Sequence, residues 1–202
     1  MLQTNTTMPP VNALPSPLKM RVWGLNDEQF EHLCEENPDL HFELNNQGEL
    51  LVMSPTGYES GWRNSELNYQ VMHWVKQQGN GKVFDSSTLF EFPSGAKRQP
   101  DVAWISQPRI DNAPLAQRSG IVRLVPDFVI ELRSPTDSLP ELQAKMEEYI
   151  NNGVRLGWLI DPQTRRVHIY APQRETVIFD DPESVSGADV LPGFTLDVRE
   201  VW

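Results

Sequence analysis

The sequence predicts one α/β domain with a mixed central β-sheet flanked by helices. Segments with strand character alternate with segments whose apolar residues fall at helical spacing, which is typical of a sheet covered by helices. The length of 202 residues suits a single domain with a full-sized core. No run approaches the roughly 18 apolar residues that span a bilayer, so no membrane segment is expected.

Residues 1–24 are predicted to form a mobile N-terminal arm, and residues 25–202 the domain itself. The stretch from Met1 to Ser16 is rich in Thr, Asn and Pro and holds few large apolar residues. It lacks the charged start and apolar stretch of a signal peptide. Cys34 is alone, which excludes an intrachain disulfide and a thiolate zinc cluster. A cytoplasmic location is the simplest interpretation.

The first half of the domain is expected to begin with a short helix. Asn26 and Gln29 form a capping pair at its start, and Pro38 ends it. The turn signal Asn45-Asn46-Gln47-Gly48 joins two strands in a hairpin. The elements expected after the short helix are strands at 40–44 and 49–53, a helix at about 59–78, and one or two strands within 82–92.

Two short strand-like segments, residues 99–105 and 126–133, each carry an acid in an apolar setting. An apolar run that is bounded by Pro and interrupted by a carboxylate is typical of a central strand that presents this carboxylate at an edge or cleft. Asp101 and Glu131, with Arg133 two residues on, follow the order Asp … Glu-x-basic. This order lets two carboxylates hold a divalent metal while a cation lies beside a scissile phosphate. The pattern points to a nuclease.

The second half of the domain is expected to continue with a loop between Ser106 and Val125 and a helix at 138–152. One apolar stripe of this helix consists of Leu142, Met146, Tyr149 and Ile150. At about 100° per residue, Lys145 lies about 40° outside the edge of the stripe, so its ammonium can reach a cleft edge. The elements expected after it are strands at 154–161 and 165–170 and an alternating segment at 193–202 that closes the sheet or serves an interface.

The chain also resembles a known family, the Uma-type family of candidate restriction endonucleases, which is abundant in cyanobacteria and belongs to the PD-(D/E)XK nuclease superfamily. The resemblance covers roughly Leu25 to Trp202, and the order of the motifs carries it rather than any single motif. It implies a restriction-endonuclease-like core. The motifs are Leu40-His41-Phe42-Glu43-Leu44, Gly48-Glu49-Leu50, Met53-Ser54-Pro55-Thr56-Gly57, Gln99-Pro100-Asp101-Val102-Ala103, Phe128-Val129-Ile130-Glu131-Leu132-Arg133-Ser134-Pro135, Lys145-Met146-Glu147-Glu148-Tyr149, Gly153-Val154-Arg155-Leu156-Gly157-Trp158-Leu159-Ile160-Asp161-Pro162 and Leu191-Pro192-Gly193-Phe194.

The resemblance implies metal-assisted hydrolysis of phosphodiester bonds. Asp101 and Glu131 would hold Mg²⁺ or Mn²⁺, and Glu43 corresponds to an acid that often supports the metal in the superfamily. Arg133 stands where the superfamily normally has Lys. Arg cannot act as a base at ordinary pH. Lys145 is therefore the better candidate if a side chain must take a proton, and either cation can stabilise charge on the phosphate.

Each of these residues has a purely structural interpretation as well. Asp101 stands at a strand start, where Asp bonds turn amides. Glu131 needs a partner because a buried unpaired carboxylate costs several kcal/mol, and that partner is either a metal or Arg133. Arg133 can simply pair with an acid, Lys145 can lie on a solvated helix face, and Glu43 can face solvent.

The net charge of −11 argues for weak affinity for nucleic acid, because phosphate neutralisation supplies much of the affinity of DNA binders. The stretch from Lys97 to Arg133 is less acidic, with six bases against four acids. We expect nucleic acid as the partner, DNA more than RNA. A homodimer is expected too, because two sites facing opposite strands suit double-strand cleavage, and the apolar segments 190–194 and 201–202 suggest a covered surface. The alternatives are a non-catalytic dimeric scaffold or regulator, and a hydrolase of small phosphate esters.

Overall fold

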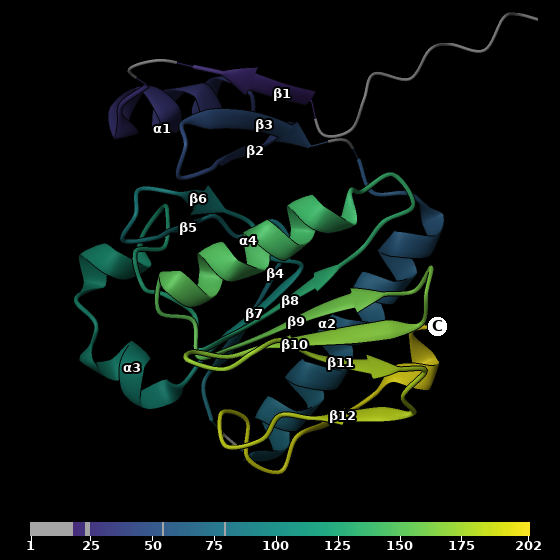
Figure 1. Ribbon diagram of the computed structural model, residues 1–202. Helices are drawn as coiled ribbons and strands as arrows, with labels where there is room; N and C mark the ends of the chain where they lie inside the picture. The colour runs from purple at the N-terminus through teal and green to yellow at the C-terminus, as the bar shows by residue number, and fades with distance from the viewer. Residues whose placement is uncertain (1–17, 23–24, 54, 79) are drawn as a thin grey trace, which may run out of the picture.

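A sheet of six strands forms the centre of the protein (Figure 1). Its strands are β4 (Lys82–Asp85), β7 (Val102–Ile105), β8 (Phe128–Leu132), β9 (Leu156–Asp161), β10 (Arg166–Tyr170) and β11 (Val177–Asp180). The computed structural model describes residues 18–22, 25–53, 55–78 and 80–202. The strand order is β11-β10-β9-β8-β7-β4, with β8 and β9 parallel and all other neighbours antiparallel. The predicted α/β class with a mixed central sheet is confirmed.

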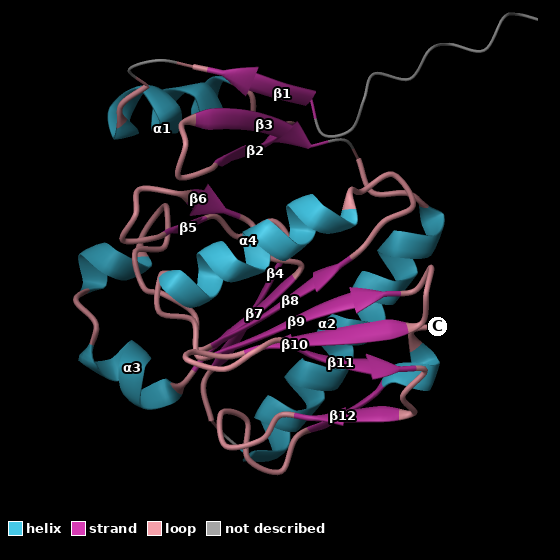
Figure 2. Cartoon of the chain, in the orientation of Figure 1, coloured by secondary structure: helices cyan, strands magenta, loops and turns pink. Residues whose placement is uncertain are grey.

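Two long helices cover the faces of the central sheet, α2 (Tyr58–Gln78) on one side and α4 (Leu139–Asn151) on the other (Figure 2). Successive residues of β8 alternate between the two cores. Those that pack on the α2 side are Phe128, Ile130 and Leu132. Val129 packs on the α4 side, and Glu131 shares its face because side chains two residues apart in a strand point the same way. Burial on both faces explains why β8 is an almost continuous apolar run.

A second sheet of five strands carries the N-terminal part of the domain. Its strands, in spatial order, are β1 (Leu18–Arg21), β3 (Glu49–Met53), β2 (His41–Leu44), β6 (Lys97–Arg98) and β5 (Phe90–Glu91). Helix α1 (Asp27–Glu36) packs on it through Phe30. The predicted capping box is confirmed, because Asn26 and Gln29 each donate a backbone N–H to the other's side chain, at 3.0 and 2.8 Å. The strands expected within 82–92 divide between the two sheets, β4 in one and β5 in the other.

Part of the predicted N-terminal arm belongs to the second sheet. Residues 18–21 form β1 and pair with β3 in antiparallel register, from Leu18 opposite Val52 to Arg21 opposite Glu49. The rest of the arm, residues 1–17 and 23–24, lies outside the described residues.

The segment from Ser106 to Val125, expected to be a loop, contains two short helical elements. These are α3 (Gln107–Asn112), with Pro108 in its first turn, and the single 3-10 turn η1 (Leu115–Arg118). The start of α3 is held by the buried Asp127, whose carboxylate accepts hydrogen bonds from the Ser106 N–H at 2.9 Å and from Arg109 at 3.0 Å. Local sequence patterns do not indicate this contact, because its partners are about twenty residues apart.

The C-terminal segment packs against α2 and completes the protein's own core. Its elements are β12 (Ser184–Ser186), β13 (Thr195–Asp197) and the 3-10 turn η2 (Val198–Glu200). Leu191 and Val201 are fully buried, and the ring of Phe194 lies 5.6 Å from that of Trp74 in α2. The expectation that this segment presents a surface to a second subunit is therefore wrong. None of the described helices is both long and apolar enough to cross a membrane.

Candidate active site

The register between β7 and β8 brings the two predicted metal-binding acids together. These strands are antiparallel, and Val102 pairs with Ile130. One step further along the same register, Asp101 lies across from Glu131, and directly opposite residues of an antiparallel pair have neighbouring side chains. The Asp101 carboxylate accepts a hydrogen bond from the backbone N–H of Leu132 at 2.8 Å, which fixes it beside β8.

Helix α2 holds Asp101 at two points. The side-chain amide of Asn64 donates to Asp101 Oδ1 at 2.7 Å, and that of Asn68 donates to the Asp101 carbonyl oxygen at 3.1 Å. Burial raises the pKa of Asp101, and the hydrogen bond from Leu132 opposes this rise without cancelling it. The ionised form is therefore disfavoured where no cation is bound.

Glu131 is buried and lies among both donors and acids. Its Oε1 accepts hydrogen bonds from the Tyr149 hydroxyl at 2.7 Å and from Lys145 Nζ at 2.9 Å. Burial raises the pKa of Glu131 to about 7; Lys145 counteracts this, and repulsion from Asp101 adds to it. No described residue donates a hydrogen bond to the other oxygen, Oε2.

Lys145 lies between two buried carboxylates. Its Nζ contacts Glu131 Oε1 and Glu43 Oε1, both at 2.9 Å, and its side chain is 10% exposed. Burial alone would lower the pKa of Lys145, but the two carboxylates outweigh burial and raise it. The helical position predicted for Lys145, just outside the apolar stripe, thus takes its ammonium into the cluster and not to solvent.

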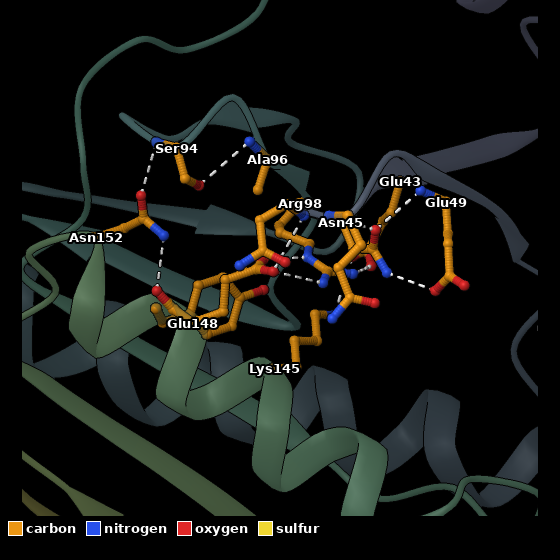
Figure 3. A network of polar contacts seen from close by, with 12 residues as sticks. Glu43, Asn45, Glu49, Ser94, Ala96, Arg98, Lys145, Glu148 and Asn152 are labelled. Carbon is orange, nitrogen blue, oxygen red and sulfur yellow. Dashed lines mark hydrogen bonds and ion pairs between the residues drawn. The ribbon is translucent and has the colours of Figure 1, made fainter. Parts of the chain in front are cut away.

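Glu43 and its partners fasten the second sheet to α4 (Figure 3). Glu43 Oε2 accepts from Arg98 at 3.0 Å, and its Oε1 accepts from the Gln99 N–H at 2.9 Å as well as from Lys145. Arg98 also makes a two-pronged contact with Glu148 of α4, at 2.7 and 3.1 Å. Burial alone would raise the pKa of Glu43, but Lys145 and Arg98 outweigh it and hold the pKa below its usual value. Both Glu43 oxygens thus already serve protein donors.

Arg133 contacts a different set of residues. Its guanidinium pairs with the buried Asp161 of β9 at 2.8 Å and donates to the carbonyl oxygen of Asp137 at 3.3 Å. Among the described residues, no contact joins Arg133 to Asp101 or to Glu131. Arg133 holds the loop that follows β8, while Lys145 is the cation in contact with a candidate metal ligand.

The donor set suits a cation that keeps much of its water. The described residues contain no group of three or more His, Cys, Asp or Glu that could hold a metal. Asp101 and Glu131 provide two carboxylates, and Mg²⁺ is commonly bound by one or two carboxylates, with waters and substrate phosphates filling its other positions. The raised pKa of both groups fits this use, because a bound cation would offset the cost of their ionisation.

Three residues of the site were given no role in it by the sequence prediction: Asn64, Arg98 and Tyr149. Tyr149 follows Lys145 by one helical turn, so the i, i+4 spacing was a usable signal that both face the same cluster. Arg98 looked like part of a basic segment, and its burial depends on a contact between the second sheet and α4. Asn64 lies 37 residues from Asp101 and carries no local signal.

The known proteins that this chain resembles are described as nucleases, in agreement with the geometry of the site. A family model described as "Putative restriction endonuclease" matches residues 27–199. The crystal structure of "a putative nuclease belonging to DUF820" from Anabaena variabilis is similar, with a TM-score of 0.69 and 25% sequence identity. The similarity covers 79% of this chain and 88% of that chain. No curated protein matches the sequence.

Proposed function

Since the chain belongs to the Uma2 family of candidate restriction endonucleases, we propose that it is a metal-dependent endonuclease that hydrolyses phosphodiester bonds of nucleic acid, with DNA as the preferred substrate. One observation carries this proposal. Asp101, directly before β7, lies across from Glu131 of β8 when the register of these two strands is continued by one residue, and Lys145 contacts Glu131 at 2.9 Å. Two acids beside a fixed cation form the minimal set for metal-assisted phosphoryl chemistry.

Asp101 and Glu131 would hold Mg²⁺ or Mn²⁺ through their carboxylate oxygens. A divalent cation bound there supplies an activated water at neutral pH and polarises the phosphoryl oxygen. The N–H of Leu132 and the amide of Asn64 keep the Asp101 carboxylate in place, and the Tyr149 hydroxyl does the same for Glu131. Such fixed geometry lowers the reorganisation needed during the reaction.

Lys145 would stabilise the negative charge that develops on the phosphate. Its ammonium is held by Glu43 on one side and Glu131 on the other. Glu43 itself is fixed by Arg98 and the N–H of Gln99, so its role is to position Lys145 and not to bind metal. Arg133 keeps a structural role through Asp161.

A plasmid-nicking assay at low salt, where phosphate affinity is greatest, tests the proposal. The wild type should nick DNA when Mn²⁺ is added, and Glu131→Gln and Lys145→Ala should not. Lys76→Ala removes a charge from the exposed face of α2 and should nick like the wild type. Arg133→Lys should be nearly silent. A wild-type protein without Mn²⁺-dependent nicking under these conditions would favour the scaffold or regulator instead.

The acidic net charge of −11 favours a second candidate, a hydrolase of small phosphate esters, which needs no basic DNA track. A small phosphodiester such as bis(4-nitrophenyl) phosphate separates the two activities. The endonuclease should cleave plasmid DNA far more efficiently than this compound. The reverse preference would support the second candidate.

A homodimer remains the expected assembly, through a surface other than the C-terminal segment. The edge strand β11 exposes three consecutive large apolar side chains, Val177, Ile178 and Phe179, each about half exposed. An edge strand with such side chains is a common site for pairing with another chain. In an antiparallel pair of two copies, Arg174 before this strand would lie near Asp181 after the same strand of the partner.

A further inference from the structure

The side-chain oxygen of Asn64, next to a candidate metal ligand, has no hydrogen-bond partner among the residues that the structure describes. Asn64 uses its Nδ2 to donate to Asp101 Oδ1 at 2.7 Å. Its Oδ1 is buried and, among the described residues, receives no hydrogen bond. Because both atoms belong to one amide group, this oxygen also lies close to the Asp101 carboxylate.

The orientation of the Asn64 amide follows from its neighbour. Asp101 must be ionised to hold a cation, and a flipped amide would then place the oxygen of Asn64 against the ionised Asp101 Oδ1, so that two acceptors would face each other with no proton between them. The other oxygen of Asp101 already accepts from the N–H of Leu132. In the cation-binding state the Nδ2 therefore faces the carboxylate, and the unpartnered atom is the oxygen.

A buried polar atom without a partner is rare in folded proteins and needs an explanation. Asn68, one helical turn further along α2, offers a comparison. Its side-chain Nδ2 donates to the main-chain carbonyl oxygen of Asp101 at 3.1 Å, and neither polar atom of its side chain is buried without a partner. The two Asn residues therefore share the task of holding Asp101, and only Asn64 has an acceptor left over beside the carboxylate.

We propose that the side-chain oxygen of Asn64 is the third protein oxygen of the metal site, bound to the cation or to a water on it. This inference rests on the proposed function, since it uses the cation held by Asp101 and Glu131. Amide oxygens are hard ligands of the kind that Mg²⁺ and Mn²⁺ accept. The Asn64 oxygen would thus supply the third ligand that acidic, His and Cys side chains do not provide among the described residues.

Calorimetric titration of the whole 202-residue chain with Mn²⁺ tests the proposal without any measurement of activity. Asn64→Leu keeps the size of the side chain and removes its oxygen, so it should weaken Mn²⁺ binding by about 10-fold or more. Asn68→Leu on the same helix also loses a hydrogen bond to Asp101 but removes no unpartnered oxygen, so it measures the cost of loosening Asp101, and it should weaken Mn²⁺ binding clearly less than Asn64→Leu does. Thermal melting in metal-free buffer shows whether each variant is folded.

A second pair of variants separates the oxygen from the N–H of Asn64. Asn64→Asp loses the donor but keeps an oxygen at the same place, so it should bind Mn²⁺ at least as tightly as the wild type. Asn68→Asp adds the same charge one turn away and controls for simple attraction, so it should gain nothing. Asn64→Asp should also melt lower than the wild type in metal-free buffer, because two carboxylates then face each other.

Two outcomes would overturn the inference. If Asn64→Leu binds Mn²⁺ with wild-type affinity, the oxygen is not used. If Asn64→Asp and Asn68→Asp gain equally in Mn²⁺ affinity, the gain comes from long-range attraction by the added charge and not from an oxygen at position 64. A failure of the proposed function looks different, because the wild type itself would then bind no Mn²⁺, or Glu131→Gln would bind it unchanged. A Mn²⁺-soaked crystal gives an independent check, since Asn64 Oδ1 should contact the ion or one of its waters.

Discussion

Arg98→Met should destabilise the protein far more than an ordinary loss of an ion pair. Arg98 donates to Glu43 at 3.0 Å and to Glu148 at 2.7 and 3.1 Å, and the three side chains are at most 8% exposed. Met fills much of the space of the Arg stem, so the loss is mainly electrostatic. Removing one partner of a buried ion pair costs roughly 3–5 kcal/mol, because a charge is left buried without compensation.

The remaining donors set the expected value at the lower end of that range. Glu43 keeps Lys145 and the N–H of Gln99, and Glu148 keeps the N–H of Asn46 at 3.3 Å. We therefore expect the free energy of unfolding to fall by about 3 kcal/mol. For a domain of this size that corresponds to a melting temperature lower by roughly 6–12 °C. Urea unfolding in metal-free buffer measures the change directly.

Arg123→Met is the matched control for this measurement. Arg123 also bridges two acids, Glu31 at 2.8 Å and Glu91 at 2.9 Å, but it is 40% exposed. Exposed pairs contribute about 0–1 kcal/mol, so this variant should lose little. If both Met variants lose the same stability, burial is not what gives the Arg98 network its strength and the reasoning fails. Glu148→Leu added to Arg98→Met should recover part of the loss, because it removes a stranded charge.

Three further predictions concern other parts of the molecule. Gly157→Ala places a Cβ 2.5 Å from the terminal methyl of Met146, so the end of this flexible side chain must shift within the core, and we expect thermal melting to report a loss of about 1 kcal/mol. Burial lowers the pKa of His168 from 6.5, so the folded state binds a proton on this ring less well than the unfolded state does. The free energy of unfolding therefore falls as the pH drops below about 6.5. The melting temperature of His168→Leu should depend less on pH between about 5 and 7 than that of the wild type. Ile178→Lys on β11 should turn a dimer into a monomer in sedimentation; a wild type that is monomeric at tens of micromolar would remove the homodimer from consideration.

The acids of the site could be located from the sequence because each one conflicts with its surroundings. A carboxylate within an apolar strand is costly unless something binds it, so Glu131 stands out from its sequence neighbours alone. The position of Lys145 could also be predicted, because helical periodicity fixes its angle to the apolar stripe. Its partners, however, come from β8 and β2, and their approach to α4 depends on packing that local patterns do not encode.

Arg133 shows what nearness in the sequence cannot decide. It stands two residues after Glu131, so alternation along a strand places both on one face. β8 ends at Leu132, and the Arg133 side chain pairs with Asp161, which lies on the neighbouring parallel strand. Parallel strands are joined by a long crossover, so this neighbour cannot be read from local sequence. The C-terminal segment is a similar case: its apolar pattern correctly indicates burial but does not say whether α2 or another subunit covers it.

The second sheet is part of the proposed active site and not an appendage to it. Glu43 belongs to β2 and Arg98 to β6, and both lie outside the central sheet that carries Asp101 and Glu131. A lysine on α4 has a long, flexible stem, and it acts as a fixed cation only if something opposes its motion. Glu43 and Glu131 both hold the ammonium at 2.9 Å, and Arg98 in turn fixes Glu43. The nuclease chemistry proposed for the central sheet therefore depends on a contact with the second one, so mutations at β2 and β6 should act on the reaction through Lys145.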